Sequence, residues 1–193
     1  LAAMQPKAGA LPDLTAPIAA MQAIERRWAP WMPTLAGQTQ GHIGSLLYMS
    51  QRYDDARPYL EKAGFQHNFA HAMLGAIHFR AGDVEGVKAA FERSVKFTNK
   101  EAVLWNAYAW CLEQLKRRDD AIAVLNRALE ALPSDGRTRA NLTALQNARR
   151  MDMSEFEMTW YQFMLEQPSR SFLEKMGYLQ NPAANLPRPG FRV

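Results

Sequence analysis

The sequence predicts an all-α protein, built as a short solenoid of helical hairpins that stack on one another, with extra helices at both ends. Two observations carry this prediction. Apolar residues recur with the period of an α-helix through the middle of the chain, and the same pattern returns at nearly constant spacing. The 193 residues, 48% of them hydrophobic and 22% charged, are enough for one domain with a substantial core.

Residues 102–135 carry the pattern most clearly. One face of a first helix is apolar at positions i, i+3, i+4 and i+7, which are Trp105, Tyr108, Ala109 and Leu112. A charged stretch then interrupts the apolar run. The helical period returns in a second helix at Ala121, Leu125 and Ala128, and Pro133 ends it. The stretch therefore predicts two helices joined by a short turn.

This spacing, W-x2-Y-A-x2-L followed by A-x3-L and a proline, resembles the tetratricopeptide repeat (TPR), a helical hairpin of about 34 residues. One repeat length upstream, Gly75 takes the place of Ala109. A further step, shortened by three residues in the turn at 62–67, brings Gly44 to the same place. The resemblance implies a right-handed α-solenoid of about three TPR-like hairpins, at residues 37–67, 68–101 and 102–135.

Flanking segments complete the predicted organisation. Residues 1–36 are expected to form an N-terminal arm and a helix that caps the first repeat. Residues 136–177 are expected to form C-terminal capping helices, and residues 178–193 are expected to form a proline-rich extended tail.

A helix is predicted over residues 154–166, because Ser154 and Glu157 have the spacing of a capping box. Apolar side chains cover most of the circumference of this helix, so it should be buried on more than one side or should mediate self-association. The residues assigned to this packing or self-association helix are Phe156, Trp160, Tyr161, Phe163 and Met164.

The TPR resemblance implies that the first helices of the hairpins line a concave groove. It implies a non-catalytic scaffold that binds a peptide or helix of a protein partner there, for the assembly of a multiprotein complex. The residues expected to face the groove are Tyr48, Met49, Phe69, Phe79, Arg80, Asn106, Trp110 and Glu113. Under this interpretation, Trp110→Ala weakens partner binding without unfolding the array. In the alternative interpretation, the groove aromatics pack on the helix around Trp160 of the same chain.

Basic residues recur in the turns inside the hairpins, which lie on one rim of the array. They are Arg52, Lys116, Arg117, Arg118, Arg149 and Arg150. One interpretation is that these cations complement the negative ends of the helix dipoles. The other is that the rim docks on an anionic membrane surface or an acidic partner, with nucleic acid the less favoured ligand; the net charge of +4 permits this docking without requiring it.

No motif for catalysis, phosphate binding or zinc binding is present, so the sequence predicts no enzyme, no cofactor and no metal site. The single Cys111 excludes a disulfide framework. His67, His71 and His78 share a helical face, and packing is favoured over metal binding because two of them hold repeat positions. No run is apolar and long enough to span a membrane, and no signal peptide is expected. The locations that fit are the cytoplasm and a membrane reached through a segment outside this chain.

Overall fold

The fold is seen in a computed structural model, which describes residues 13–177. The arm expected over residues 1–12 and the tail expected over residues 178–193 lie outside the described residues. The described chain runs through helices and turns in the order α1 (Thr15–Trp28), α2 (Leu35–Met49), α3 (Tyr53–Glu61), α4 (Asn68–Arg80), α5 (Val84–Phe97), α6 (Ala102–Gln114), α7 (Arg118–Ala131), α8 (Gly136–Gln146), the 3-10 turn η1 (Ser154–Phe156), α9 (Glu157–Tyr161) and α10 (Arg170–Lys175).

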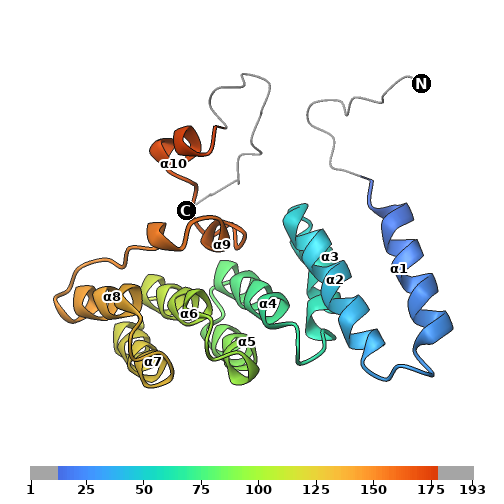
Figure 1. Ribbon diagram of the computed structural model, residues 1–193, viewed down its shortest axis with the longest axis horizontal. Coiled ribbons are helices and arrows are strands. Elements are labelled where there is room, and N and C mark those ends of the chain that lie inside the picture. Colours follow the sequence, from blue (N-terminus) through green and yellow to red (C-terminus); the bar gives the residue numbers. More distant parts are fainter. Residues whose placement is uncertain (1–12, 178–193) are drawn as a thin grey trace.

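Three antiparallel hairpins stack in sequence order: α2 with α3, α4 with α5, and α6 with α7 (Figure 1). The first helices form one layer and the second helices form the other, while α1 and α8 extend the stack at its two ends. The prediction of an all-α solenoid of TPR-like hairpins is confirmed for the described part of the chain.

The turns inside the hairpins share a backbone device. Each turn contains one residue whose backbone lies in the left-handed region. These residues are Gln51 (φ 60°), Gly82 (φ 71°) and Lys116 (φ 63°). This conformation ends a helix in one residue and lets the chain reverse. Ala148 (φ 55°) does the same after α8, so α8 ends as the first helix of a fourth hairpin would. An irregular segment follows it in place of a second helix.

Glycines allow the two helices of a hairpin to approach closely. An added Cβ at Gly44 would lie 2.7 Å from Cδ2 of Leu60, and one at Gly75 would lie 2.5 Å from Cε2 of Phe91. In the third hairpin this position is Ala109, which is fully buried. The third hairpin accepts a methyl group where the first two accept only a hydrogen atom.

The prediction of one continuous helix over residues 154–166 is wrong. Helical residues there are confined to η1 and to the short α9, and a turn follows. Glu157 adopts a left-handed φ of 48° and Met164 one of 49°, so the chain bends twice. Ser154 is not the N-cap, because it is the first residue of η1 and follows the N-cap residue Met153. The bends turn the apolar side chains of the segment toward the solenoid.

Candidate functional site

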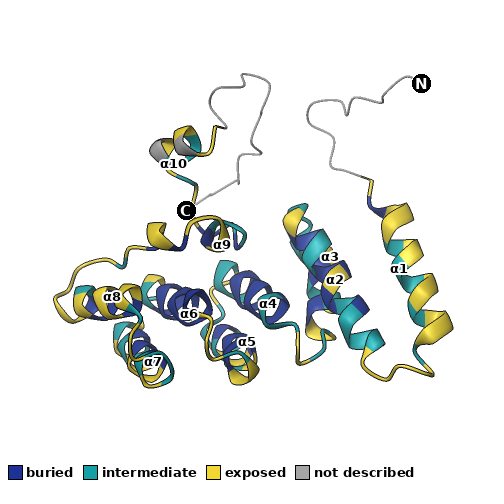
Figure 2. Ribbon diagram, in the orientation of Figure 1, coloured by how far each residue is buried: buried dark blue, intermediate teal, exposed yellow. Residues whose placement is uncertain are grey.

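The concave groove is filled by the protein's own chain. Residues 153–165, called here the crossing segment, lie over the first helices, and Figure 1 shows α9 beside α4 and α6. Its large apolar side chains are buried in one common core with the solenoid: Met153, Phe156, Trp160, Phe163 and Leu165. Figure 2 shows the ribbon of α9 coloured in part as buried.

Trp160 is the central anchor of the crossing segment. Its side chain is fully buried and lies edge-on against Trp110 of α6, with 5.2 Å between ring centroids. Phe79 of α4 packs on the indole of Trp110, with 5.4 Å between ring centroids. Trp160 Nε1 donates to Glu166 Oε2 at 2.9 Å, so the one polar atom of the buried indole is satisfied.

Phe163 anchors the second half of the segment. Its ring stacks on Phe69 of α4 with 6.0 Å between centroids and an interplanar angle of 8°. The backbone carbonyl of Phe163 accepts a hydrogen bond from the hydroxyl of Tyr48 in α2. Burial raises the pKa of Tyr48, so this phenol remains a neutral donor. The contact joins residues that are 115 positions apart.

Arg80 and Tyr53 hold the bend at Met164. Arg80 Nη2 donates to the carbonyl of Met164 at 2.6 Å, and its guanidinium lies 4.5 Å above the ring centroid of Tyr53. The Tyr53 hydroxyl lies 3.6 Å from Met164 Sδ. A cationic donor on a backbone carbonyl makes a strong hydrogen bond, which fixes the backbone where it turns.

A buried amide network holds the start of the crossing segment. Asn141 of α8 donates to Asn106 Oδ1 at 2.9 Å and to the carbonyl of Asp152 at 3.0 Å. Its own Oδ1 accepts from the backbone N–H of Asp152 at 2.7 Å. Asn106 donates in turn to Ala102 O and Thr138 Oγ1, both at 2.8 Å. Every polar atom of these two buried amides has a partner in the same chain.

The residues predicted to face the groove therefore meet the chain itself. Tyr48, Phe69, Phe79, Arg80, Asn106 and Trp110 contact the crossing segment or the side chains that anchor it. Met49 stays 47% exposed, and Glu113 forms an ion pair with Arg118 at 3.6 Å. The structure matches the interpretation in which the aromatics pack on a terminal segment of the same chain.

The side chains predicted to mediate packing or self-association make contacts within the chain itself. Phe156, Trp160 and Phe163 are buried, and Tyr161 packs against Phe172 of α10 with 4.8 Å between ring centroids. Asn141 was not predicted as a site residue. One feature of the sequence indicates its burial: it is an amide on the face of α8 that also holds the buried Leu142 and Leu145.

The basic rim is partly neutralised by neighbouring carboxylates. Arg52 pairs with Asp55 at 2.7 Å and Arg117 pairs with Asp120 at 3.1 Å. The hydrogen bond from Lys88 is the main cause that lowers the pKa of Asp120, so this carboxylate is ionised at neutral pH. The exposed members of the rim that form no ion pair within residues 13–177 are Lys116, Arg149 and Arg150.

The described residues contain no cluster of three or more metal-ligating side chains, and no helix among them is long and apolar enough to cross a membrane. His71 is buried, and burial lowers its pKa. Cys111 is also buried, and burial raises the pKa of its thiol. The Cys111 thiol therefore stays protonated at neutral pH, and the His71 imidazole stays neutral.

A second apolar surface lies on the edge formed by the turns between hairpins. It is called the aromatic rim here and consists of Trp31, Met32, Pro33, Phe65 and Phe97. Trp31 is 81% exposed, and Phe65 and Phe97 contact each other with 5.1 Å between ring centroids. This surface was not predicted from the sequence, although Trp31 and Phe65, large aromatic residues inside predicted turns, were a visible signal.

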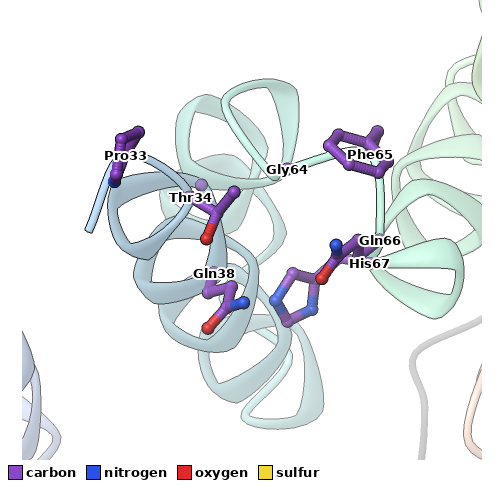
Figure 3. Close-up of a pocket in the computed structure, with 8 residues that line it drawn as sticks. Pro33, Thr34, Gln38, Gly64, Phe65, Gln66 and His67 are labelled. Atoms are coloured by element: carbon purple, nitrogen blue, oxygen red, sulfur yellow. The ribbon is translucent and has the colours of Figure 1, made fainter.

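A shallow pocket of about 180 Å³ opens at the aromatic rim, between the start of α2 and the turn after α3. Figure 3 shows Pro33 and Phe65 on opposite sides of it, with Gln38 and His67 between them. Gly64 donates its backbone N–H to Gly37 O at 2.9 Å, which joins the two walls. Burial, and then the nearby His42, lower the pKa of His67, so the pocket presents a neutral imidazole.

Comparison with known proteins matches residues 102–145 to the family model described as tetratricopeptide repeat. The match spans α6, α7 and α8, that is, the third hairpin and the first helix of the incomplete fourth. Neither the comparison with curated proteins nor the comparison with solved structures found a match.

Proposed function

We propose that this chain, which contains a tetratricopeptide repeat, is a non-catalytic scaffold that binds other proteins and brings them into a larger complex. Repeats of this family generally mediate protein–protein interaction, and stacked hairpins give them an extended, rigid surface.

The filled groove argues against the concave side as the partner site. A partner peptide would have to displace the crossing segment and expose five buried side chains: Met153, Phe156, Trp160, Phe163 and Leu165. At about 1.5–3 kcal/mol for each side chain, displacement costs on the order of 10 kcal/mol. A ligand would need equivalent contacts before it gained any net affinity.

The aromatic rim is the partner surface that we favour, and the observation that carries the proposal is Phe65, which lines the pocket and is 52% exposed. Exposed apolar clusters mark interaction sites, and aromatic side chains dominate the binding energy of interfaces. The pocket holds the volume of about six water molecules, which suits one apolar side chain of a partner peptide. Gln38 and His67 add polar groups that would orient the peptide backbone.

The test compares partner capture from native lysate by the intact chain and by a Trp31→Ser/Phe65→Ser variant. Both side chains are largely exposed, so the variant should keep its helical content and melting temperature. Loss of a partner that the intact chain captures is the expected result. Met49→Ser is the matched control, because Met49 is an exposed apolar residue on the groove side.

A chain that ends at Asp152 tests the groove directly, because it lacks the whole crossing segment. If this shortened chain remains helical and captures the partner more strongly than the intact chain, the groove is the partner site. Unchanged capture by the Trp31→Ser/Phe65→Ser variant would also contradict the rim proposal.

A further inference from the structure

Three successive turns on one edge of the solenoid each combine an exposed aromatic residue with exposed cations. The turns join α1 to α2, α3 to α4 and α5 to α6, and they hold Trp31, Phe65 and Phe97 of the aromatic rim. The cations beside these three residues are, in the same order, Arg26 and Arg27, then Lys62, then Lys96 and Lys100. The combination recurs with the repeat, so it is a property of the whole edge.

Side-chain contacts connect the pocket of the aromatic rim to these cations. Phe65 lines the pocket, and its ring centroid lies 5.1 Å from that of Phe97. Lys96 Nζ lies 5.4 Å from the centroid of the Phe97 ring. Lys62 is the C-cap residue of α3 and stands three positions before Phe65. A ligand that fills the pocket and follows the two phenyl rings therefore reaches Lys96, and Lys62 belongs to the turn that forms one wall of the pocket.

The positive charge of this edge is not neutralised within residues 13–177. None of its five cations forms an ion pair there, whereas three arginines of the basic rim do. Among the neighbouring carboxylates, Glu61 pairs with Arg57 at 3.6 Å. Glu25 accepts from Gln40 at 3.0 Å, and Glu101 is exposed. Five cations beside these carboxylates leave an excess of positive charge.

Helix dipoles do not cancel this excess. Each of the three turns joins the carboxyl end of one helix to the amino end of the next, so the negative and positive dipole ends offset each other at this edge. The side chains therefore set the sign of the edge, and a negatively charged ligand is the one that complements it.

The pocket favours a peptide over a membrane as this negative ligand. Its volume of about 180 Å³ accommodates a single side chain. Its lining includes the amide of Gln38 and the neutral imidazole of His67, which can form hydrogen bonds with a peptide backbone. The acyl chains of a bilayer offer no hydrogen-bond partner to these groups, so covering them with lipid would carry a cost.

We propose that the partner segment at the aromatic rim is an acidic, extended peptide, with an apolar side chain in the pocket and carboxylates beside Lys62 and Lys96. This inference rests on the proposed function, because it names the chemistry of the partner at the same surface. Neighbouring helices lie about 10 Å apart, so three successive turns span about 20 Å. An extended chain covers this distance with about six residues. The recognised segment is therefore short.

Selection from a phage-displayed library of random peptides tests this chemistry without knowledge of the partner. The full chain is the bait, and a Phe65→Ser chain of the same net charge removes peptides that bind through charge alone. The remaining peptides should be enriched in Asp and Glu around one apolar residue. Peptides that need Phe65 but lack this enrichment would overturn the acidic inference and keep the rim as the partner site. If no peptide needs Phe65, the inference and the rim proposal both fail.

Charge reversal tests the two lysines. Lys62→Glu/Lys96→Glu should weaken binding of a selected peptide about tenfold or more, because two attractive pairs become repulsive. Fluorescence polarisation of the labelled peptide measures the change. Arg149→Glu/Arg150→Glu is the matched control, since it makes the same change of net charge at two exposed arginines of the basic rim. Equal weakening in both variants would show that only net charge matters and would overturn the assignment.

Salt and lipid complete the test. Binding of the selected peptide should weaken as NaCl rises from about 0.05 to 0.5 M, whereas the peptide with its carboxylates changed to amides should bind more weakly and respond little to salt. Sedimentation with phosphatidylcholine vesicles that contain about 30% phosphatidylserine examines the other anionic ligand. Vesicle binding that Phe65→Ser abolishes, together with peptide binding that salt leaves unchanged, would overturn the proposal and assign the edge to a membrane surface.

Discussion

The indole of Trp160 lies edge-on against the indole of Trp110, with 5.2 Å between their centroids, and this contact closes the groove of the solenoid. Trp110 is only 7% exposed as a result. The sequence-based expectation that Trp110→Ala spares the fold is therefore replaced by its opposite. Trp110 belongs to the core, and its truncation should destabilise the protein.

Trp160→Ala should lower the free energy of unfolding by about 3–5 kcal/mol, because it empties a fully buried site that the surrounding helices cannot refill. Urea unfolding followed by circular dichroism measures the change. Met158→Ala is the control on the same short helix, since Met158 is 49% exposed and its truncation should change the free energy by less than about 0.5 kcal/mol. Equal effects of the two substitutions would contradict the assigned burial.

Gly75→Ala should destabilise the protein by about 1–3 kcal/mol, even though alanine is the better helix former by up to about 1 kcal/mol. The added methyl group would lie 2.5 Å from the ring of Phe91 and would force α4 and α5 apart. Gly136→Ala is the matched control, because a Cβ there meets no atom within 4 Å. Thermal melting should place the control at or above the intact chain, and a stabilised Gly75→Ala variant would refute the close contact.

Asn141→Ala should cost about 1–3 kcal/mol, because it leaves the backbone N–H of Asp152 and the buried carbonyl oxygen of Asn106 without this partner. The start of the crossing segment should also loosen. Limited proteolysis should then cut near residue 150 sooner than in the intact chain. Asn147→Ala changes an exposed amide at the end of the same helix, and cleavage at the same rate in both variants would show that the network does not hold the segment.

The stability of the protein should fall as the pH drops from about 7 to about 5. Burial lowers the pKa of His71 in the folded state below its ordinary value near 6.5, so the unfolded chain binds the proton more readily. The stabilisation is present above the unfolded pKa and is lost as the pH falls below it. Urea unfolding at several pH values measures the slope.

His71→Leu removes this titrating group and should give a shallower decline over the same pH interval. His67, whose pKa burial also lowers, should account for part of the slope that remains. A decline as steep as that of the intact chain would show that His71 does not contribute to it.

The sequence by itself determined the hairpins, because their signals are local. The face with Trp105, Tyr108, Ala109 and Leu112 predicted α6, and its repetition around Gly75 and Gly44 predicted the stack. Adjacent hairpins contact each other through residues about one repeat apart. A pattern that repeats along the chain therefore also predicts which residues meet. The same pattern predicted a shared face for Tyr48, Phe69 and Trp110, and in the structure all three contact the crossing segment.

Only the tertiary structure decided what occupies the groove. The contacts of Phe163 with Tyr48 and of Met164 with Arg80 span 115 and 84 positions, and no local periodicity encodes such pairs. Burial of Trp160 and Phe163 together requires bends at Glu157 and Met164, so long-range packing overrode the helix that the Ser154–Glu157 spacing predicted. Packing also left Trp31 largely exposed and left no residue of α1 buried, because no distant segment of the described chain covers them.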